Sequence, residues 1–464
     1  MGKIYFRTIS YHAENTLRRC VDSVLNQTYR SEDIIYYICN NPYSHPDATE
    51  EMVREYAARE PRIRAFYNRE NNVWLPENRI SQEFIRDLAD DDYFCVLDSD
   101  DEYQLTFLEK LLPFMEENRL DIGVCGSDFV DAQTGRITGQ RTLRQPLLLT
   151  RPEDFTELFP IYHQFMRTQW AKVFSGRVAR EMYTVLNRPK ELAELCYGSD
   201  TIYTFSALRH AKRVGIFPET LHRYYVSATS GSSAYIPGRP VSDVIRFQDA
   251  IAYLSASGPV SEKNRLFISC VYANAVSDTV DALKNAALSP EEKLAELRKI
   301  AENQVTRDTF RRNMPEIRKS RFNLLAVALV CGSVLEGNSE DLRAILRTMT
   351  EEQPLLRGIG NALFPQKHPE IFLAVWQEQY EQALDQMTGL LLEGEEPDEA
   401  FLQLYLSLAA SQEIVPAFLF GKVQLAKLYL RQGEKEACRS ILDELTEMGV
   451  EDNDEILELR RNAT

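Results

Sequence analysis

The sequence predicts an α/β domain with a mostly parallel, Rossmann-like sheet flanked by helices, followed by an all-helical domain. Strand and helix signals alternate through the first 236 residues, and such alternation implies crossover connections between parallel strands. Beyond Pro237-Gly238-Arg239-Pro240, nearly every segment carries apolar residues at helical spacing. We therefore expect one domain at residues 1–236 and a second at residues 237–464.

The first domain opens with strand-like segments at residues 3–10, 33–39, 63–67 and 93–97. The second of these, DIIYYIC, is a continuous apolar, β-branched and aromatic run, as expected of a strand buried on both faces. Helices are expected between the strands. They cover residues 14–25, where apolar residues recur at helical spacing, and residues 48–59 and 80–89.

The second domain is expected to contain several helices, which cover residues 261–283, 290–303, 319–335, 370–392 and 399–410. Near its end, spaced apolar and small residues approximate one tetratricopeptide-type helix pair with a turn at Gln432-Gly433. These residues are Leu425, Ala426, Tyr429, Gly433, Cys438, Leu442 and Leu445. Because solenoid repeats usually come in threes or more, we favour a small helical bundle packed on the first domain.

Composition restricts the class of protein. Of the 464 residues, 44% are hydrophobic and 27% are charged, which indicates a core-forming chain. No run of about 18 apolar residues occurs, and the most apolar stretch, residues 322–334, fits a buried helix. The chain begins in strand-like sequence without the apolar core of a signal peptide, so we expect a cytoplasmic protein without a membrane span. Its eight cysteines are scattered singly, which argues against a structural zinc site and fits a reducing compartment.

Charge excludes a further class of partner. The formal net charge is −17, whereas nucleic-acid binding needs a basic footprint, so we expect no nucleic-acid partner. Roughly 23 acidic and 11 basic side chains lie in residues 341–464, which places about −12 of that charge in the last quarter of the chain. The helical domain is therefore not attracted to an anionic membrane surface, and we expect it to bind the acceptor, form a homo-oligomer or dock on a partner enzyme.

The strongest chemical feature is the sequence LDSDD at residues 97–101, directly after a predicted strand. In open parallel sheets, ligands bind beyond the carboxyl ends of the strands. Clustered carboxylates ionise together at low cost only around a cation, and hard oxygen ligands suit Mg²⁺ or Mn²⁺, which usually also hold substrate phosphates. The alternative is structural, with Asp100 or Asp101 capping the helix that contains Phe107.

Other segments resemble the inverting family 2 glycosyltransferases. Residues 9–17 (ISYHAENTL) and 21–29 (VDSVLNQTY) are similar to the opening of that family, "P-x-Y-N-x-x-x-x-L" followed by "S-x-L-x-Q-T-Y". The resemblance covers about residues 3–235. It implies a glycosyltransferase A-type fold that uses a nucleotide-diphospho-sugar. Asp98 and Asp100 match the family's DxD pair, so the resemblance assigns the Mn²⁺ or Mg²⁺ ion to Asp100 and the ribose or the metal shell to Asp98, with Asp101 as a third carboxylate.

The resemblance also implies a base for the acceptor hydroxyl, which an inverting transfer needs opposite the leaving group. Residues 197–203 (YGSDTIY) resemble the family's "G-x-D" or "E-D" element, so Asp200 is the candidate catalytic base, with a helix N-cap as the alternative role. Residues 169–174 (QWAKVF) and 222–227 (HRYYVS) are similar to the segments that precede and follow this element in the family.

The expected donor site departs from the family at several positions. The family's Asp-Asp after the second strand is Asn40-Asn41 here, which keeps an acceptor but loses the charge, and its Tyr-Asn is Tyr11-His12. The resemblance implies that the nucleotide-sugar is bound by Tyr11, His12, Glu14, Asn40, Asn72, Asp98, Ser99 and Arg223. Arg223 would hold the diphosphate, since a guanidinium forks onto phosphate. For His222, a metal-ligand role and a role as a hydrogen-bonded or solvent-facing strand residue both stay open.

The sequence thus predicts a metal-dependent inverting glycosyltransferase. It would move a sugar from a nucleotide-diphospho-sugar, with UDP-sugar favoured, to a hydroxyl of a glycan, lipid-linked or protein acceptor in surface polysaccharide or glycoconjugate synthesis. The alternative is a catalytically inactive, glycosyltransferase-like interaction protein, which the Asn40-Asn41 change motivates. A nucleotidyltransferase is less favoured, because the chain lacks a basic, Gly-rich phosphate loop.

Overall fold

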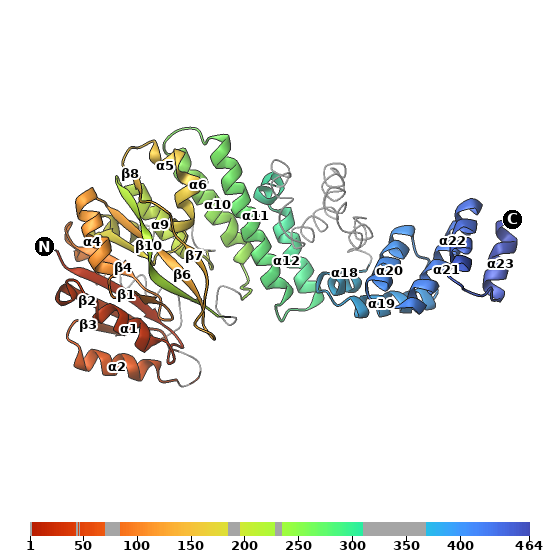
Figure 1. The fold of residues 1–464 in the computed structure, drawn as a ribbon, viewed down its shortest axis with the longest axis horizontal. Helices are drawn as coiled ribbons and strands as arrows, with labels where there is room; N and C mark the ends of the chain where they lie inside the picture. Colours follow the sequence, from red (N-terminus) through yellow and green to blue (C-terminus); the bar gives the residue numbers. More distant parts are fainter. Residues whose placement is uncertain are drawn as a thin grey trace. The chain divides into compact units, whose positions relative to one another are not determined.

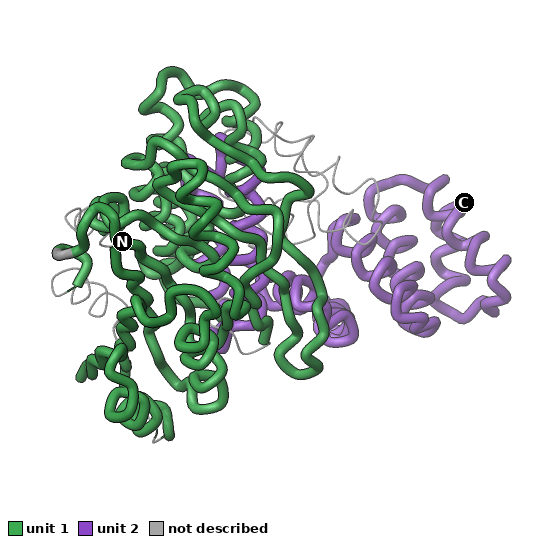
Figure 2. Tube along the Cα trace, turned by 60° about the vertical axis from the view of Figure 1, so that its left-hand side comes forward, with its two compact units in different colours: residues 1–268 green, residues 269–464 purple. Residues whose placement is uncertain are grey.

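The structure is a computed structural model, which describes residues 2–42, 45, 47–69, 84–183, 195–227, 234–309 and 368–464. The chain divides into two compact units, residues 1–268 and 269–464, shown in two colours in Figure 2. This division lies 32 residues beyond the change of sequence texture at residue 236, because helix α10 (Arg239–Ser255) packs on α9 within the first unit. The extent of the catalytic domain stays a prediction.

The first unit is built on one sheet with the strand order β3-β2-β1-β4-β9-β6-β10-β5, with β7 on β6 and β8 on β10 (Figure 1). The strands are β1 Ile4–Ser10, β2 Ile34–Asn40, β3 Ile63–Tyr67, β4 Tyr93–Val96, β5 Glu102–Tyr103, β6 Ile122–Asp131, β7 Ile137–Arg141, β8 Leu147–Leu149, β9 Lys172–Ser175 and β10 Val214–Val226. Strands β3, β2, β1 and β4 are mutually parallel, and β10 is parallel to β6. Strand β9 is antiparallel to both of its neighbours, β4 and β6. The predicted α/β fold is confirmed, and the carboxyl ends of β1, β2 and β4 lie at one edge.

Helices and short helical turns connect these strands. They are α1 Leu17–Leu25, η1 Ser31–Asp33, α2 Thr49–Arg59, η2 Ile85–Asp87, α4 Phe107–Asn118, α5 Asp154–Glu157, α6 Phe159–Tyr162, η3 His163–Met166, α7 Gly176–Met182, α9 Ser199–His210 and α10. Around β1, which lies between β2 and β4, is an aromatic core in which Phe6 contacts Tyr36, Tyr103 and Phe107 at ring-centroid distances of 6.1 to 6.5 Å. Burial of such a side chain contributes about 1.5–3 kcal/mol, so this core holds the strands that carry the site.

The helix expected over residues 80–89 is wrong for the part that the structure describes. Residues 84–89 contain the short 3₁₀ turn η2, after which Leu88 is extended. The reason is local packing, since Phe84 is buried against Tyr37 at a ring-centroid distance of 3.8 Å, and the Ala89 N–H donates to the Asp92 carboxylate over 2.7 Å. These contacts stabilise a turn where the apolar pattern alone predicts a helix.

The described residues of the second unit are helical, as predicted. Its helices are α11 Glu262–Lys284, which begins in the first unit, α12 Pro290–Glu302, α18 Pro369–Trp376, α19 Tyr380–Leu392, α20 Glu399–Ser411, α21 Val415–Arg431, α22 Lys435–Glu447 and α23 Asp454–Ala463. From α18 to α23 each helix packs on the next, and α23 also packs on α21. The turn expected at Gln432-Gly433 separates α21 from α22, where Gly433 has a φ of 81°. The helix predicted over residues 319–335 and the apolar stretch 322–334 lie outside the described residues.

One predicted helix, over residues 370–392, is in fact two. Helix α18 ends at Trp376 and α19 begins at Tyr380, because Glu378 between them has a left-handed φ of 63°. The Gln379 N–H closes the first helix by donating to the Ala374 carbonyl over 2.8 Å. The apolar spacing continues through this turn, so periodicity alone could not reveal it. Among the described residues, none of the helices combines the length and apolar character that a membrane span needs.

Candidate active site

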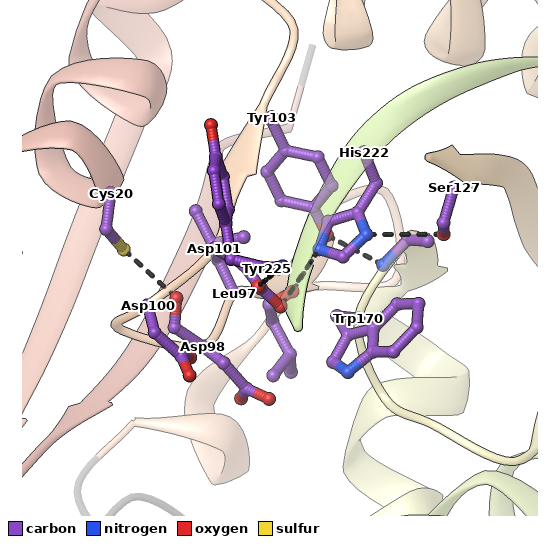
Figure 3. A network of polar contacts seen from close by, with 12 residues as sticks. Cys20, Leu97, Asp98, Asp100, Asp101, Tyr103, Ser127, Trp170, His222 and Tyr225 are labelled. Carbon is purple, nitrogen blue, oxygen red and sulfur yellow. Dashed lines mark hydrogen bonds and ion pairs between the residues drawn. The ribbon is translucent and has the colours of Figure 1, made fainter. Parts of the chain in front are cut away.

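Three carboxylates converge in the loop that follows β4. Asp98, Asp100 and Asp101 each offer an oxygen, and these oxygens all lie within 4.8 Å of one another (Figure 3). The loop is a tight turn, in which the Asp101 N–H donates to the Asp98 carbonyl over 3.1 Å. Such a set of hard oxygen atoms is the donor type that Mg²⁺ and Mn²⁺ take in proteins.

Neighbouring elements hold the backbone of this loop. The Thr8 hydroxyl on β1 donates to the Leu97 carbonyl over 2.7 Å, and the Cys20 thiol on α1 donates to the Asp98 carbonyl over 3.3 Å. The guanidinium of Arg19, also on α1, donates to the Asp100 carbonyl and lies 3.5 Å from the centre of the Tyr225 ring on β10. Strand β1 and helix α1 therefore hold the backbone of the loop that carries the three carboxylates.

A buried histidine lies behind Asp101. His222 Nε2 is 3.5 Å from Asp101 Oδ2, and His222 Nδ1 is 3.2 Å from the Ser127 hydroxyl oxygen. The imidazole stacks on Trp170 at a ring-centroid distance of 4.4 Å, and the other oxygen of Asp101 accepts from the Tyr225 N–H over 2.9 Å. Burial lowers the pKa of His222 to about 3, so the ring is neutral.

One oxygen of this arrangement suits a cation. Within the described part of the chain, Asp101 Oδ2 is fully buried and makes no hydrogen bond of normal geometry, with His222 Nε2 3.5 Å away. A buried carboxylate oxygen normally has a partner, and a cation would supply one. The carboxylate cluster therefore fits a divalent ion by its donor type, its convergence and this unsatisfied oxygen.

The carboxylates of the cluster repel one another when they are ionised. Burial raises the pKa of Asp98 well above its usual value, and the carboxylates of Asp200, Asp101 and Asp100 raise it further. Burial and then Asp100 likewise raise the pKa of Asp101, and desolvation raises that of Asp100. Without a cation, these carboxyl groups thus bind protons more tightly in the folded protein than in the unfolded chain.

The helix-capping roles considered for Asp100, Asp101 and Asp200 are wrong. Helix α4 begins at Phe107 with Thr106 as its N-cap residue, so neither Asp100 nor Asp101 caps it. Asp200 is the second residue of α9, whose N-cap position is Gly198. Both acidic elements therefore lie where a purely capping role does not explain them.

Asp200 joins the site from α9. Its carboxylate is close enough to Asp98 to raise the pKa of that group. Asp200 Oδ1 accepts from Gln169 Nε2 over 2.9 Å, and Gln169 Oε1 accepts from Arg7 Nη2 over 3.4 Å. The structure thus places Asp200 near Asp98 of the carboxylate cluster. Its role as the base stays a prediction.

The residues expected on the nucleotide side follow β1 and β2. Asn40 ends β2 beside Ser10 of β1, and Asn40 Oδ1 accepts from the Ser10 hydroxyl over 2.9 Å. The next residue, Asn41, accepts from Asn68 Nδ2 through its own side-chain oxygen over 2.7 Å. In both asparagines the oxygen that replaces a family carboxylate is engaged within the protein.

The other candidate donor-site residues lie in several different segments of the first unit. Tyr11 is exposed, His12 Nδ1 is 3.3 Å from Asp47 Oδ2, and Glu14 accepts from the Ala48 N–H over 3.1 Å, so the last two face the start of α2. Ser99 lies in the carboxylate loop. Arg223 on β10 pairs with Glu102 on β5 over 2.9 Å. Asn72 lies outside the described residues.

A family comparison agrees with this geometry. Residues 8–175 match the family model described as Glycosyl transferase family 2. Residues 8–175 belong to glycosyl transferase family 2. This match includes the last three residues of β1, the carboxylate loop and Gln169, but it ends before Asp200 and His222.

Relatives of this family 2 region carry the name glycosyltransferase. The chain is 27% identical over 232 residues to the uncharacterized glycosyltransferase YibD of Escherichia coli and 27% identical over 235 residues to the uncharacterized glycosyltransferase EpsJ of Bacillus subtilis. These alignments cover 49% and 50% of this chain, and 62% and 63% of those proteins. The chain thus matches less than two thirds of the length of either relative.

Two solved structures resemble this chain distantly. Residues 1–349 of S. aureus TarS, in complex with UDP-GlcNAc, match 82% of this chain and 92% of that one at 14% identity and a TM-score of 0.41. The mannosyltransferase PcManGT from Pyrobaculum calidifontis, in complex with GDP-Man and Mn²⁺, matches 71% of this chain and 87% of that one at 12% identity and a TM-score of 0.37. The family assignment rests on the family model.

Several side chains of the family 2 site were not predicted from the sequence. Arg7 could have been noticed, because it is a charged residue inside a buried strand, KIYFRTIS. Arg19, Cys20 and Gln169 gave no such signal, since each lies in a segment whose pattern is explained by its helix or loop. Their roles depend on contacts across 31 to 162 positions in the chain, which spacing does not reveal.

Proposed function

We propose that the first unit transfers a sugar from a nucleotide-diphospho-sugar to an acceptor hydroxyl. The observation that carries this proposal is the convergence of Asp98, Asp100 and Asp101 at the carboxyl end of β4, with Asp200 beside them. The family 2 match over residues 8–175 supports the same reaction class. Unlike a structural cap, this cluster places like charges together, and a bound cation would relieve their repulsion.

The three aspartates would hold a Mn²⁺ or Mg²⁺ ion. When bound, the ion would neutralise negative charge on the departing nucleoside diphosphate. Asp101 presents its unsatisfied Oδ2, and the neutral His222 ring lies behind that oxygen at 3.5 Å. In this proposal His222 supports Asp101 from behind, while a direct ligand role for His222 stays a prediction.

Asp200 would act as the base in a single inverting displacement. A proton must leave the acceptor hydroxyl as its oxygen attacks the anomeric carbon, and a carboxylate within hydrogen-bond reach can accept it. Asp200 is in the first turn of α9, near Asp98 of the carboxylate cluster. The proton therefore passes to Asp200 while the bond to the diphosphate breaks.

The donor nucleotide would lie along the ends of β1 and β2, near Tyr11, His12, Glu14 and Asn40. Arg223 would hold the diphosphate after release from Glu102. A UDP-sugar is the first donor to test. The acceptor would be a hydroxyl of a glycan, a lipid-linked molecule or a protein, in cytoplasmic synthesis of surface polysaccharide. The acidic helical unit would bind this acceptor, form a homo-oligomer or dock on a partner enzyme.

A thermal-shift panel of UDP, GDP, CDP and dTDP, each with and without Mn²⁺, tests this proposal. A ligand at 100 times its Kd stabilises the folded protein by about 2.7 kcal/mol. We expect one nucleotide to stabilise the protein only with Mn²⁺, and Asp100→Ala to abolish that shift. A nucleotide shift that is unchanged in Asp100→Ala would contradict the assigned site.

A second candidate is an inactive, glycosyltransferase-like interaction protein. The engaged side-chain oxygens of Asn40 and Asn41 favour it, because both are already hydrogen-bonded within the protein. The same panel separates the two candidates. Well-folded protein that responds to none of the four nucleotides, with or without metal, would support the inactive form.

A further inference from the structure

We propose that Gln169 is a positioning residue that orients the carboxylate of Asp200 for proton transfer. This inference rests on the function proposed above. Gln169 lies between η3 and β9 with only 1% of its surface exposed. Its Nε2 donates to Asp200 Oδ1 over 2.9 Å, and its Oε1 accepts from Arg7 Nη2 over 3.4 Å. One side chain thus connects β1 to the first turn of α9.

Arg7 determines which way round the amide lies. A guanidinium can only donate, so the amide oxygen must face Arg7 and the amide nitrogen must face Asp200. Oδ1 of Asp200 is then engaged by an N–H, and Oδ2 is the oxygen that would receive the proton of the acceptor hydroxyl. A carboxylate held in one rotation in this way presents a defined oxygen to the reacting group.

A neutral donor suits a base better than a cation does. A cation bonded directly to Asp200 would stabilise the anion and reduce its affinity for a proton. The amide of Gln169 supplies the hydrogen bond without a formal charge. Arg7, which is buried and carries that charge, stands one side chain further away and acts electrostatically on Asp98 instead.

The loop that carries Gln169 is held without its side chain. From α9, the hydroxyls of Thr201 and Thr204 donate to the carbonyls of Arg167 and Thr168 over 2.9 and 3.1 Å. The buried ammonium of Lys172 donates to the Thr168 carbonyl over 2.6 Å and to the Trp170 carbonyl over 3.1 Å. Because these bonds fix the loop, the bond from Gln169 to Asp200 adds orientation of the carboxylate rather than attachment of the loop.

The variant Gln169→Glu isolates that bond. It has nearly the same shape and still accepts from Arg7, but it has no N–H for Asp200. We expect kcat for release of UDP from UDP-glucose or UDP-N-acetylglucosamine, with Mn²⁺, to fall by about 10- to 100-fold. The donor KM should stay within about threefold, because Gln169 is not among the residues of the proposed donor site. In an Asp200→Asn background, the same change should alter kcat by less than about twofold, since the two residues act as a unit.

Gln27→Leu is the matched control. Gln27 is also a buried glutamine, and its Nε2 donates to the carbonyls of Ser23 and Gln104 over 2.8 and 2.9 Å. This variant loses buried hydrogen bonds in the same unit without touching Asp200. We expect its kcat per folded molecule to stay within about twofold of the wild type.

A substrate-free measurement tests the link directly. Gln169→Glu alone should lower the melting temperature of the first unit by roughly 2–4 °C, because two carboxylates then meet. Adding Asp200→Asn should restore more than half of that loss, since the amide introduced by this second change can donate to the new carboxylate. If the double variant shows no recovery, the two side chains are not coupled and the inference is overturned.

The outcomes separate the inference from the function on which it rests. Multiplicative losses in kcat from Gln169→Glu and Asp200→Asn would overturn the inference and leave the proposed function intact. An equal loss in Gln27→Leu would also overturn it, because the effect would then be structural. A wild type that turns over neither donor would contradict the proposed function, and the melting series alone would then decide the link.

Discussion

Replacing Asp98 by asparagine should stabilise the protein in the absence of metal. Asp98 lies among Asp100, Asp101 and Asp200, which all raise its pKa, and burial raises it further. The asparagine amide has the same shape as the carboxyl group and removes one of the like charges that repel each other. The site would then be more stable and less able to hold a cation, as expected where a functional site opposes folding.

The magnitude follows from the separation of the oxygens. Two full charges 4.8 Å apart repel by about 3.5 kcal/mol at an effective dielectric constant of about 20. Partial protonation reduces this repulsion, and so do the neighbouring cations Arg7 and Arg19. We therefore expect Asp98→Asn to raise the free energy of unfolding by about 1–2 kcal/mol, or the melting temperature by about 2–6 °C.

The effect should depend on pH with a defined sign. A carboxyl group whose pKa is raised by folding binds protons more tightly in the folded protein, so stability falls as pH rises from about 4 through the folded pKa. The advantage of Asp98→Asn should thus be small at pH 5 and larger at pH 8. Melting curves of metal-free protein in chelator at both pH values measure it.

Two results would refute this reasoning. One is an Asp98→Asn protein that is less stable than the wild type at pH 8 without metal. The other is a stabilisation by Mn²⁺ that is equal in the variant and the wild type. Asp91→Asn is the control, because Asp91 is an exposed acidic residue of the same unit outside the cluster, and it should change neither quantity.

Three further predictions concern the base, the buried histidines and the second unit. Asp200→Asn should lower kcat by at least about 100-fold while leaving the Mn²⁺-dependent UDP shift intact, and loss of the UDP shift would contradict a role confined to proton transfer. Burial lowers the pKa of His163 and His222 to about 3, so the unfolded chain takes up protons that the folded chain does not. Stability should therefore decrease as pH falls from about 6.5 towards 3, and His163→Leu should make this decrease less steep in acid unfolding. An equally steep decrease in His163→Leu would contradict the prediction. Glu378→Gly should stabilise the second unit by about 1 kcal/mol, measured by urea unfolding, because glycine adopts the left-handed φ of 63° without strain, whereas Glu378→Ala should not.

The first half of the sheet could be predicted because its signals are local. The strands β1 to β4 are apolar runs. The segments predicted for β1 and β4 differ from the observed strands by one residue at one end, and that for β2 by one residue at each end. The signal fails where tertiary contacts oppose periodicity. Phe84 packs on Tyr37 and leaves a 3₁₀ turn, and Glu378 reverses the chain within a continuous apolar pattern.

The acidic residues of the site could be predicted, but their supports could not. Asp98, Asp100 and Asp200 occur in recognisable short segments, whereas the contact between His222 and Asp101 joins residues 121 positions apart. That contact depends on the register of β10, whose residues His222 and Arg223 pair with Tyr103 and Glu102 of β5. Strand register at this range is set by the packed sheet and not by any local pattern.

The residue whose backbone holds Asp101 comes much later in the chain than the three aspartates, and this order has a consequence during synthesis. The three clustered aspartates emerge from the ribosome by residue 101, but the backbone N–H that holds Asp101 belongs to Tyr225 on β10, the last strand of the sheet to be made. Strand β10 also pairs with β6 through most of its length. A nascent chain that stops before β10 therefore carries the three aspartates without their final restraint, and the proposed cation site should form only after about half of the protein has been translated.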